Sequence, residues 1–345
     1  MIFLRARRLS IIAALATFLV PASSSPGQVP AQAPEQSSKP NLLDRIFGSR
    51  QDPGGGWLFA GSKKDGEAGV YFAISKDGYN WLYVNDGSPV VRQTERDELM
   101  RDPFIQRAPD GTLALLWTWS TTSPAIGYST SLDLVHWSKN RKLSLMAGIP
   151  GALAATSPSA YYDPAKKDWL VLWSGSVAGH PGSSPEERIY SSTTTDFKQF
   201  TPAKLFFDPG YNVTDATLIG SGMPGLSYMF FQDERANPPQ KHIAAAEGPR
   251  MTGPWKAISQ PIAGAGAESP APLAVGNGLL VYYHQARDPQ GYGAAFTKDM
   301  EHWDDESLRI SFPAGVRHGS VLHITTDEYN MLHHYYRRYD AGLEK

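Results

Sequence analysis

The chain has 345 residues, with 32 lysines and arginines against 34 aspartates and glutamates, so its formal net charge is −2. The basic residues are scattered rather than clustered, which argues against a nucleic-acid binder. Hydrophobic residues make up 41% and aromatic residues 11%, enough for a sizeable core. Cysteine is absent, which excludes disulfides, zinc–thiolate sites and a cysteine nucleophile.

The N-terminal segment has the features of an export signal. Arg5, Arg7 and Arg8 precede an apolar stretch at residues 9–20, which ends in small residues and is too short to span a bilayer. We therefore expect a cleavable signal peptide at residues 1–22, a secreted or periplasmic protein and no membrane insertion. A buried N-terminal helix is the alternative.

The rest of the chain divides into a linker, one large domain and a tail. Residues 23–50 are rich in Pro, Gln and Ser and predict a linker, with a short helical prelude at 43–47. We expect the folded domain at residues 51–325. Residues 326–345 follow a capping-box sequence and predict a tail with a short helix.

A similar segment recurs five times within the large domain, each time after an apolar strand. Each copy has a strand of small residues, a turn and a closing aromatic residue. The copies lie at residues 71–81, 127–137, 189–200, 243–255 and 292–303. Four of the turns carry an aspartate, which we interpret as a structural turn residue: Asp77, Asp133, Asp196 and Asp299.

Four short antiparallel strands per repeat, arranged radially, form the blades of a propeller. The sequence therefore predicts an all-β fold, a five-bladed β-propeller, with a β-sandwich as the alternative. The first repeat lacks an innermost strand, whereas residues 317–324 form a lone strand after the fifth repeat. We expect this C-terminal strand to pair with the first blade and close the ring, which also protects the sheet edges.

Acidic residues stand at the starts of the innermost strands. Asp102, Asp215 and Glu268 open the second, fourth and fifth blades, and His318 opens the closing strand. Innermost strands converge on the propeller axis, so these side chains should share one pocket. Two carboxyl groups in one pocket suit glycoside hydrolysis, where one protonates the leaving oxygen and the other activates water. Taken singly, each acid could instead be a turn former, a strand cap or a solvated charge.

Five short motifs resemble glycoside hydrolase family 43 and related five-bladed β-propeller glycosidases. They are Arg101-Asp102-Pro103, Ser157-Pro158-Ser159-Ala160, Thr214-Asp215-Ala216-Thr217, Glu268-Ser269-Pro270 and Arg317-His318-Gly319. The resemblance covers residues 57–325 and implies an inverting hydrolase of O-glycosyl bonds, similar to arabinofuranosidases, xylosidases or galactosidases. Family members often carry Trp-Ala-Pro and an acid where this chain has Thr156-Ser157-Pro158-Ser159, so we expect the substrate contacts there to differ.

The resemblance also implies a role for each acid. Asp102 would be the general base, Asp215 the group that raises the pKa of the donor and orients it, and Glu268 the general acid. We expect an ionised Asp102 and a Glu268 that stays protonated near neutral pH, because the nearby Asp215 carboxylate disfavours a second charge. No cofactor is implied for catalysis. A structural calcium ion in the central channel is implied near His318, bound through water, although a hydrogen-bonded core histidine is the alternative.

An oligo- or polysaccharide is the expected partner, and we expect a monomer. Aromatic and polar side chains near the strand starts are candidates for substrate contacts, although the aromatic ones could equally be core residues. The candidates are Phe104, Trp119, Ser159, Tyr161, Phe231, Arg287 and His318. Two other functions remain open, a β-fructosidase-like hydrolase, whose Asn-Asp-Pro-Asn-Gly signature is absent, and a non-catalytic sugar-binding propeller.

Overall fold

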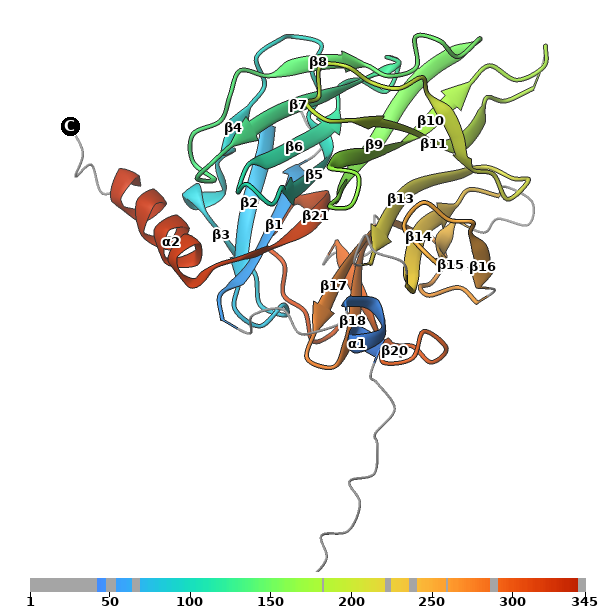
Figure 1. Cartoon of the computed structure of the whole chain (residues 1–345). Helices are drawn as coiled ribbons and strands as arrows, with labels where there is room; N and C mark the ends of the chain where they lie inside the picture. Colours follow the sequence, from blue (N-terminus) through green and yellow to red (C-terminus); the bar gives the residue numbers. More distant parts are fainter. Residues whose placement is uncertain are drawn as a thin grey trace, which may run out of the picture. The chain divides into compact units, whose positions relative to one another are not determined.

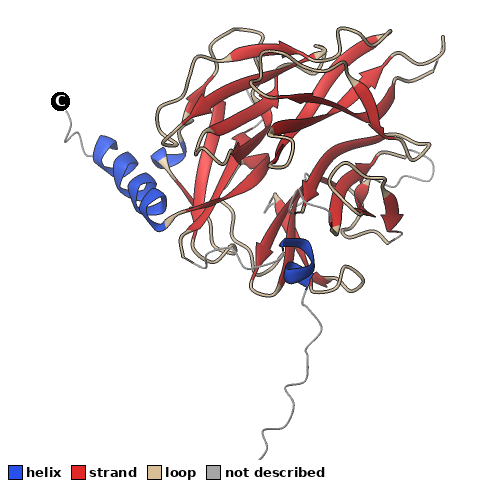
Figure 2. Ribbon diagram, viewed as in Figure 1, coloured by secondary structure: helices blue, strands red, loops and turns tan. Residues whose placement is uncertain are grey.

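Five antiparallel sheets make up the part of the chain that the computed structural model describes, and strands dominate the ribbon (Figure 2). The described residues are 42–47, 54–63, 69–181, 183–220, 225–235, 241–258, 260–285 and 291–340. They all belong to one unit, Pro40–Lys345. The predicted signal peptide, the linker up to residue 41 and the candidate Arg287 lie outside the described residues.

Each sheet has four or five strands (Figure 1). The first blade holds β1 (Gly56–Lys63), β2 (Gly69–Ser75), β3 (Leu82–Tyr83), β4 (Val91–Arg92) and the C-terminal β21 (Val316–Ile324). The second holds β5 (Arg101–Arg107), β6 (Leu113–Thr118), β7 (Ala125–Ser131) and β8 (Arg141–Ser144). The third holds β9 (Ala152–Asp163), β10 (Asp168–Val177), β11 (Glu186–Thr194) and β12 (Lys204–Phe207). The fourth holds β13 (Val213–Ile219), β14 (Ser227–Asp233), β15 (His242–Gly248) and β16 (Lys256–Ile258). The fifth holds β17 (Ala267–Val275), β18 (Gly278–Gln285), β19 (Tyr292–Thr297) and β20 (Asp304–Asp305). A short 3₁₀ helix, η1 (Asn85–Gly87), follows β3.

The innermost strands close a ring, which confirms the predicted five-bladed β-propeller. Contacts run from β21 to β5, β9, β13, β17 and back to β21. The predicted closure is also confirmed, because β21 pairs antiparallel with β1 from Gly56↔Ile324 to Lys63↔Val316. Residues far apart in the sequence therefore share the first sheet, and the starts of five strands face one axis.

The apolar strand of each repeat lies inside its blade. Every residue of β6 and of β14 is buried. Each sheet packs against two neighbouring sheets, so both faces of its second strand are covered, which explains continuous apolar runs such as Leu113-Ala114-Leu115-Leu116-Trp117.

The four repeated aspartates form the turns that the sequence predicts. Asp77 Oδ1 accepts hydrogen bonds from the backbone N–H groups of Tyr79 and Asn80, both at 2.8 Å. Asp133, Asp196 and Asp299 bind the N–H groups two and three residues on in the same way. These carboxylates hold the turn after the third strand of their blades and are structural.

Two helices flank the sheets in sequence. α1 (Leu42–Phe47) lies in the segment predicted as linker, but Leu42 and Ile46 are buried in the cluster formed around blades four and five. Two apolar residues one helical turn apart share a face, which explains how so short a helix packs. α2 (Thr326–Asp340) follows β21, and Leu332 is buried against the first blade. Within the described residues, no helix has both the length and the apolar character that crossing a bilayer requires.

Candidate active site

Every innermost strand has a bulge near its start, and the bulge presents the site residues. Register shifts interrupt the pairing of β5, β9, β13, β17 and β21 with their neighbours. At each bulge one residue has a positive φ: Asp102 (49°), Ser157 (47°), Asp215 (56°), Ser269 (56°) and His318 (35°). A bulge re-aims a side chain, and such backbone angles are uncommon for these residue types. The fivefold repeat therefore builds one strained position into each blade, facing the channel.

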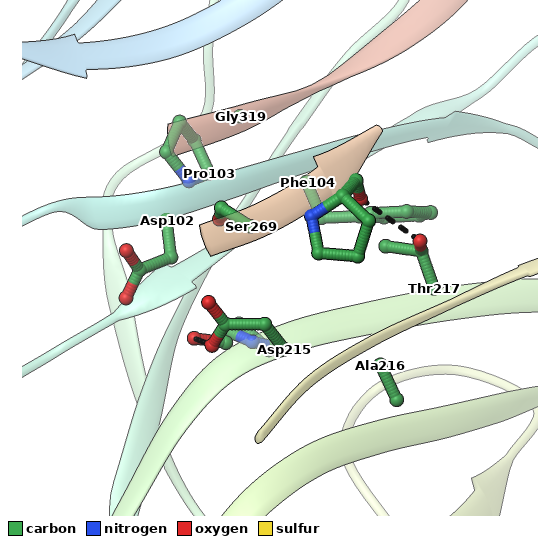
Figure 3. A pocket seen from close by; sticks show the side chains of 11 residues that line it. Asp102, Pro103, Phe104, Asp215, Ala216, Thr217, Ser269 and Gly319 are labelled. Atoms are coloured by element: carbon green, nitrogen blue, oxygen red, sulfur yellow. Dashed lines mark hydrogen bonds between the residues drawn. The ribbon is translucent and has the colours of Figure 1, made fainter. Parts of the chain in front are cut away.

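The three acids and His318 meet in one pocket, as the sequence predicts. The pocket has a volume of about 210 Å³. It is lined by Arg101, Asp102, Thr121, Thr156, Ser157, Thr214, Asp215, Gln232, Glu234, Lys241, Glu268 and His318. A smaller cavity, shown in Figure 3, also lies between Asp102 and Asp215 and is bordered by Ser269 and Gly319. Every residue that lines this pocket is polar or charged, which provides hydrogen-bonding groups for a hydroxyl-rich ligand.

Asp102 is held as a carboxylate. Its Oδ2 accepts a hydrogen bond from the Thr118 hydroxyl at 2.7 Å, and its Oδ1 lies 2.6 Å from Nδ1 of His318. Burial alone would raise the pKa of Asp102, but His318, the charge of Arg101 and the Thr118 hydroxyl lower this pKa to about 2. Asp102 is thus ionised at neutral pH, as a general base must be.

Asp215 has the opposite environment. Burial is the main cause that raises its pKa, and the negative charges of Asp102 and Glu268 add to it, so that the pKa reaches about 6. His318 and the Ser157 hydroxyl, which donates to Oδ1 at 2.6 Å, act in the other direction. Asp215 is therefore the carboxyl group of the three that holds a proton most readily.

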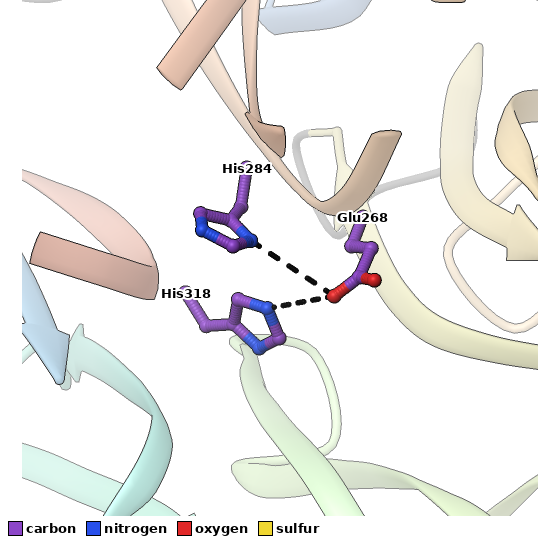
Figure 4. A group of neighbouring side chains, drawn as sticks. All are labelled: Glu268, His284 and His318. Carbon is purple, nitrogen blue, oxygen red and sulfur yellow. Dashed lines mark hydrogen bonds and ion pairs between the residues drawn. The ribbon is translucent and has the colours of Figure 1, made fainter. Parts of the chain in front are cut away.

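The sequence predicts a protonated Glu268, but the structure favours its ionised form. Its Oε2 lies 3.9 Å from Nδ1 of His284 and 3.1 Å from Nε2 of His318 (Figure 4). Both imidazoles lower the pKa of Glu268 below its usual range. The expectation considered only the charge of Asp215, whereas the fold places two histidines closer. In the free protein Asp215 and His318 therefore hold a proton more readily than Glu268 does.

His318 lies between Asp102 and Glu268. One ring nitrogen contacts Asp102 and the other contacts Glu268. Burial by itself would lower the pKa of His318, but the two carboxylates raise it to about 10, so the ring is a buried cation at neutral pH. This arrangement supports the alternative of a hydrogen-bonded core histidine while also placing His318 at the pocket.

Several pocket residues were not found by sequence reasoning. Glu234 Oε2 forms an ion pair with Lys241 Nζ at 3.1 Å, and its Oε1 accepts a hydrogen bond from Gln232 Nε2 at 2.7 Å. The available signal was weak, because a polar residue such as Gln232 at the end of an apolar strand is common. Ser157 and Thr118, which bind Asp215 and Asp102, were missed for the same reason.

Most predicted sugar contacts are instead core residues. Phe231 is 0% and Trp119 1% exposed, so neither ring offers a face to a ligand. Phe104 and Tyr161 are buried against each other, and Tyr161 Oη accepts a hydrogen bond from Leu218 N. Neither lines the larger carboxylate pocket, although Phe104 borders the smaller cavity between Asp102 and Asp215 (Figure 3). Ser159, another predicted substrate contact, is also buried, and its hydroxyl donates a hydrogen bond to the Ala216 carbonyl. Successive side chains along a strand point to opposite faces of the sheet, and the bulge reverses which of them face the axis.

The residues next to His318 offer few oxygen ligands for a directly bound calcium ion, and a calcium ion held through water stays a prediction. Calcium takes six to eight oxygen ligands. Both ring nitrogens of His318 are already engaged by carboxylates, and the nearest cluster that could hold an ion, Glu268, His284 and His318, offers two nitrogens and one carboxylate.

Comparison with known proteins finds relatives of this chain. An α-L-arabinofuranosidase of Bifidobacterium longum is 21% identical over 217 residues, which are 55% of this chain. The match spans only 20% of the length of that relative. An endo-1,4-β-xylanase structure from Bacteroides thetaiotaomicron has a TM-score of 0.52 at 12% identity and covers 76% of this chain and 92% of its own. A structure named glycoside hydrolase has a TM-score of 0.53 at 11% identity and covers 78% and 94%. These structural likenesses show the shared fold.

The family assignment rests on a longer match. Residues 56–330 match the family 43-related family described as a probable glycosyl hydrolase domain. The match spans all five blades and all three acids. The chain therefore belongs to this family of probable glycosyl hydrolase domains related to family 43, and it has the five-bladed β-propeller fold.

Proposed function

We propose that this glycoside hydrolase inverts configuration and releases sugars from polysaccharide side chains, in the manner of an arabinofuranosidase, xylosidase or galactosidase. The observation that carries the proposal is the placement of Asp102 and Glu268 on the two nitrogens of one imidazole ring. The ring and its two hydrogen bonds hold the carboxylates about 7 Å apart, within the roughly 6.5–9.5 Å typical of inverting enzymes, and both carboxylates line one pocket. We also propose a secreted or periplasmic location, from the N-terminal signal sequence.

The environment of Asp102 suits the proposed role of general base. It is ionised, and Thr118 and His318 fix its orientation. Asp102 would take a proton from the water that attacks the anomeric carbon, while the leaving oxygen receives a proton on the opposite side. The positive His318 also stabilises the ionised carboxylate before the proton arrives.

Glu268 is the proposed donor, because its side chain is 28% exposed, borders the pocket and holds the position that the resemblance implies. A bound sugar would expel water from around this carboxyl group, and desolvation raises a carboxyl pKa. Asp215 is a second candidate, favoured by its raised pKa. In the first case Asp215 orients Glu268, and in the second Glu268 stabilises developing positive charge.

The direct test is NMR of the first anomer formed from nitrophenyl arabinofuranoside, xyloside and galactoside. We expect the inverted anomer, and retention would contradict the proposal. Glu268→Gln should slow alkyl glycosides about 10²–10⁴-fold and activated aryl glycosides much less, because an aryl leaving group needs little protonation. Asp102→Asn should slow both alike. If Asp215→Asn and not Glu268→Gln shows this dependence on the leaving group, Asp215 is the donor.

A further inference from the structure

Glu234 and Lys241 form an ion pair at the mouth of the carboxylate pocket. Glu234 follows β14 and Lys241 precedes β15, and Glu234 Oε2 lies 3.1 Å from Lys241 Nζ. Both residues line the pocket that holds the three acids. The side chain of Lys241 is 57% exposed and that of Glu234 is 16% exposed, so the ammonium group faces solvent and the carboxylate lies deeper. A ligand that enters the pocket can therefore contact both groups.

Hydrogen bonds fix Glu234 in position. The buried Gln232 donates from Nε2 to Glu234 Oε1 at 2.7 Å, and the Glu234 backbone N–H donates to the Asn212 carbonyl at 2.9 Å. An ionised carboxylate has about four acceptor positions, so the three contacts from the described residues Lys241, Gln232 and Thr214 leave capacity for a ligand hydroxyl. Glu234 is thus an acceptor that is already oriented before a ligand arrives.

The pair lies on the side of the pocket opposite the proposed base. The innermost strands follow one another around the axis in the order β21, β5, β9, β13 and β17, so β13 and β17 are not neighbours of β5. Asp102 comes from β5, whereas the two candidate donors, Asp215 and Glu268, come from β13 and β17. Glu234 and Lys241 belong to the blade of β13. In an inverting reaction water attacks on one side and the leaving oxygen departs on the other, so the pair lies on the leaving-group side.

Lys241 is also linked to the strand that carries Glu268. Its carbonyl accepts a hydrogen bond from the backbone N–H of Gly266 at 2.6 Å, two residues before Glu268. The hydrogen bond with Glu234 raises the pKa of Lys241, and the negative charge of Glu268 adds to this rise. The ammonium group is therefore charged and within electrostatic reach of Glu268. A sugar bonded to the oxygen that Glu268 protonates would lie beside Lys241.

We propose that Glu234 and Lys241 form a subsite for the sugar of the leaving group, in which Lys241 donates to one hydroxyl and Glu234 accepts from a neighbouring hydroxyl. The inference rests on the proposed hydrolysis and adds its substrate class, a glycoside whose leaving group is itself a sugar residue. An ammonium group next to a carboxylate offers donors and an acceptor side by side. A nitrophenyl or methyl leaving group has no pair of hydroxyls to use them, so the pair selects saccharides over such glycosides.

The test compares two substrates that share the terminal sugar and differ in the leaving group. Nitrophenyl arabinofuranoside, xyloside and galactoside are paired with arabinobiose, xylobiose and galactobiose. Lys241→Met should lower kcat/KM for the disaccharide about tenfold more than for the nitrophenyl glycoside, the lower end for a hydrogen bond to a charged group, because Lys241 is more than half exposed. The loss should appear mainly as a higher KM, because the contact is made before and during bond cleavage. Lys241→Arg, which keeps a cationic donor, should regain most of it.

Lys166→Met is the matched control. Lys166 Nζ lies 3.1 Å from Asp163 Oδ2, and the two side chains are 58% and 18% exposed, nearly the same values as for Lys241 and Glu234. Neither Lys166 nor Asp163 is among the residues that line the carboxylate pocket. Lys166→Met should therefore leave the ratio of the two kcat/KM values unchanged.

A binding measurement separates this subsite from the proposed hydrolysis. In the slow variant Asp102→Asn, calorimetry should show tighter binding of the disaccharides than of the corresponding methyl glycosides, and adding Lys241→Met should remove this preference. The subsite is overturned by an unchanged ratio in folded Lys241→Met, by equal losses on both substrates, by a ratio that Lys166→Met also changes, or by no preference for disaccharides. Retention of configuration together with an altered ratio would contradict inversion and support the subsite. If no glycoside is hydrolysed, the proposed function fails and the binding preference alone decides the subsite.

Discussion

The Ser157 hydroxyl offers the sharpest test of the electrostatics at the site. It donates to Asp215 Oδ1 at 2.6 Å and stabilises the charged form, so Ser157→Ala should raise the pKa of Asp215 from its value of about 6. A hydrogen bond to a charged group contributes roughly 1.5–3 kcal/mol, and one pKa unit corresponds to about 1.4 kcal/mol. Asp215 is only partly buried, so we take the lower end and expect a rise of about one unit.

The pH profile of kcat/KM measures this shift, because it reports essential groups of the free enzyme. If Asp215 must be ionised to orient Glu268, the acidic limb of Ser157→Ala moves to higher pH by about one unit. If Asp215 donates the proton, the alkaline limb moves upward instead. Ser159→Ala is the matched control, since its hydroxyl lies two residues away and binds the Ala216 carbonyl rather than the Asp215 carboxylate. Identical profiles for Ser157→Ala and the wild type would refute the reasoning.

Three further changes have defined outcomes. Thr118→Val removes a 2.7 Å hydrogen bond that stabilises ionised Asp102, so the pKa of Asp102 should rise. The acidic limb of the kcat/KM profile should then move to higher pH, and a move to lower pH would contradict the assignment. Gly127→Ala would drive a Cβ into the Trp117 ring and should destabilise the protein by about 1–3 kcal/mol in urea unfolding, while Gly148→Ala, which meets nothing within 4 Å, should be close to neutral. Deleting residues 316–345 removes the strand that closes the ring and should abolish the cooperative thermal transition seen by circular dichroism; a wild-type melting curve would contradict this.

The local pattern of the sequence was enough to predict the architecture. A propeller blade forms from contacts within one repeat, so the apolar strand, the small-residue strand and the Asp turn recur wherever the blade recurs. The missing first strand and the extra last one predicted the pairing of β21 with β1, because an unpaired edge is unfavourable. The start of an innermost strand lies near the axis in any such ring, and this placed Asp102, Asp215 and Glu268 together before the structure was known.

The tertiary structure decided the orientation and the charge of those groups. A bulge changes which side chains face the channel, so the alternation of residues alone could not separate the buried Phe231 from a pocket wall. The pKa of Glu268 depends on His284 and His318, which come from other strands and have no sequence relation to it. Electrostatic interactions depend on distance and burial rather than on residue order. For this reason the sequence alone determined the blades and the set of acids, whereas only the packing of five strands determined which acid is charged.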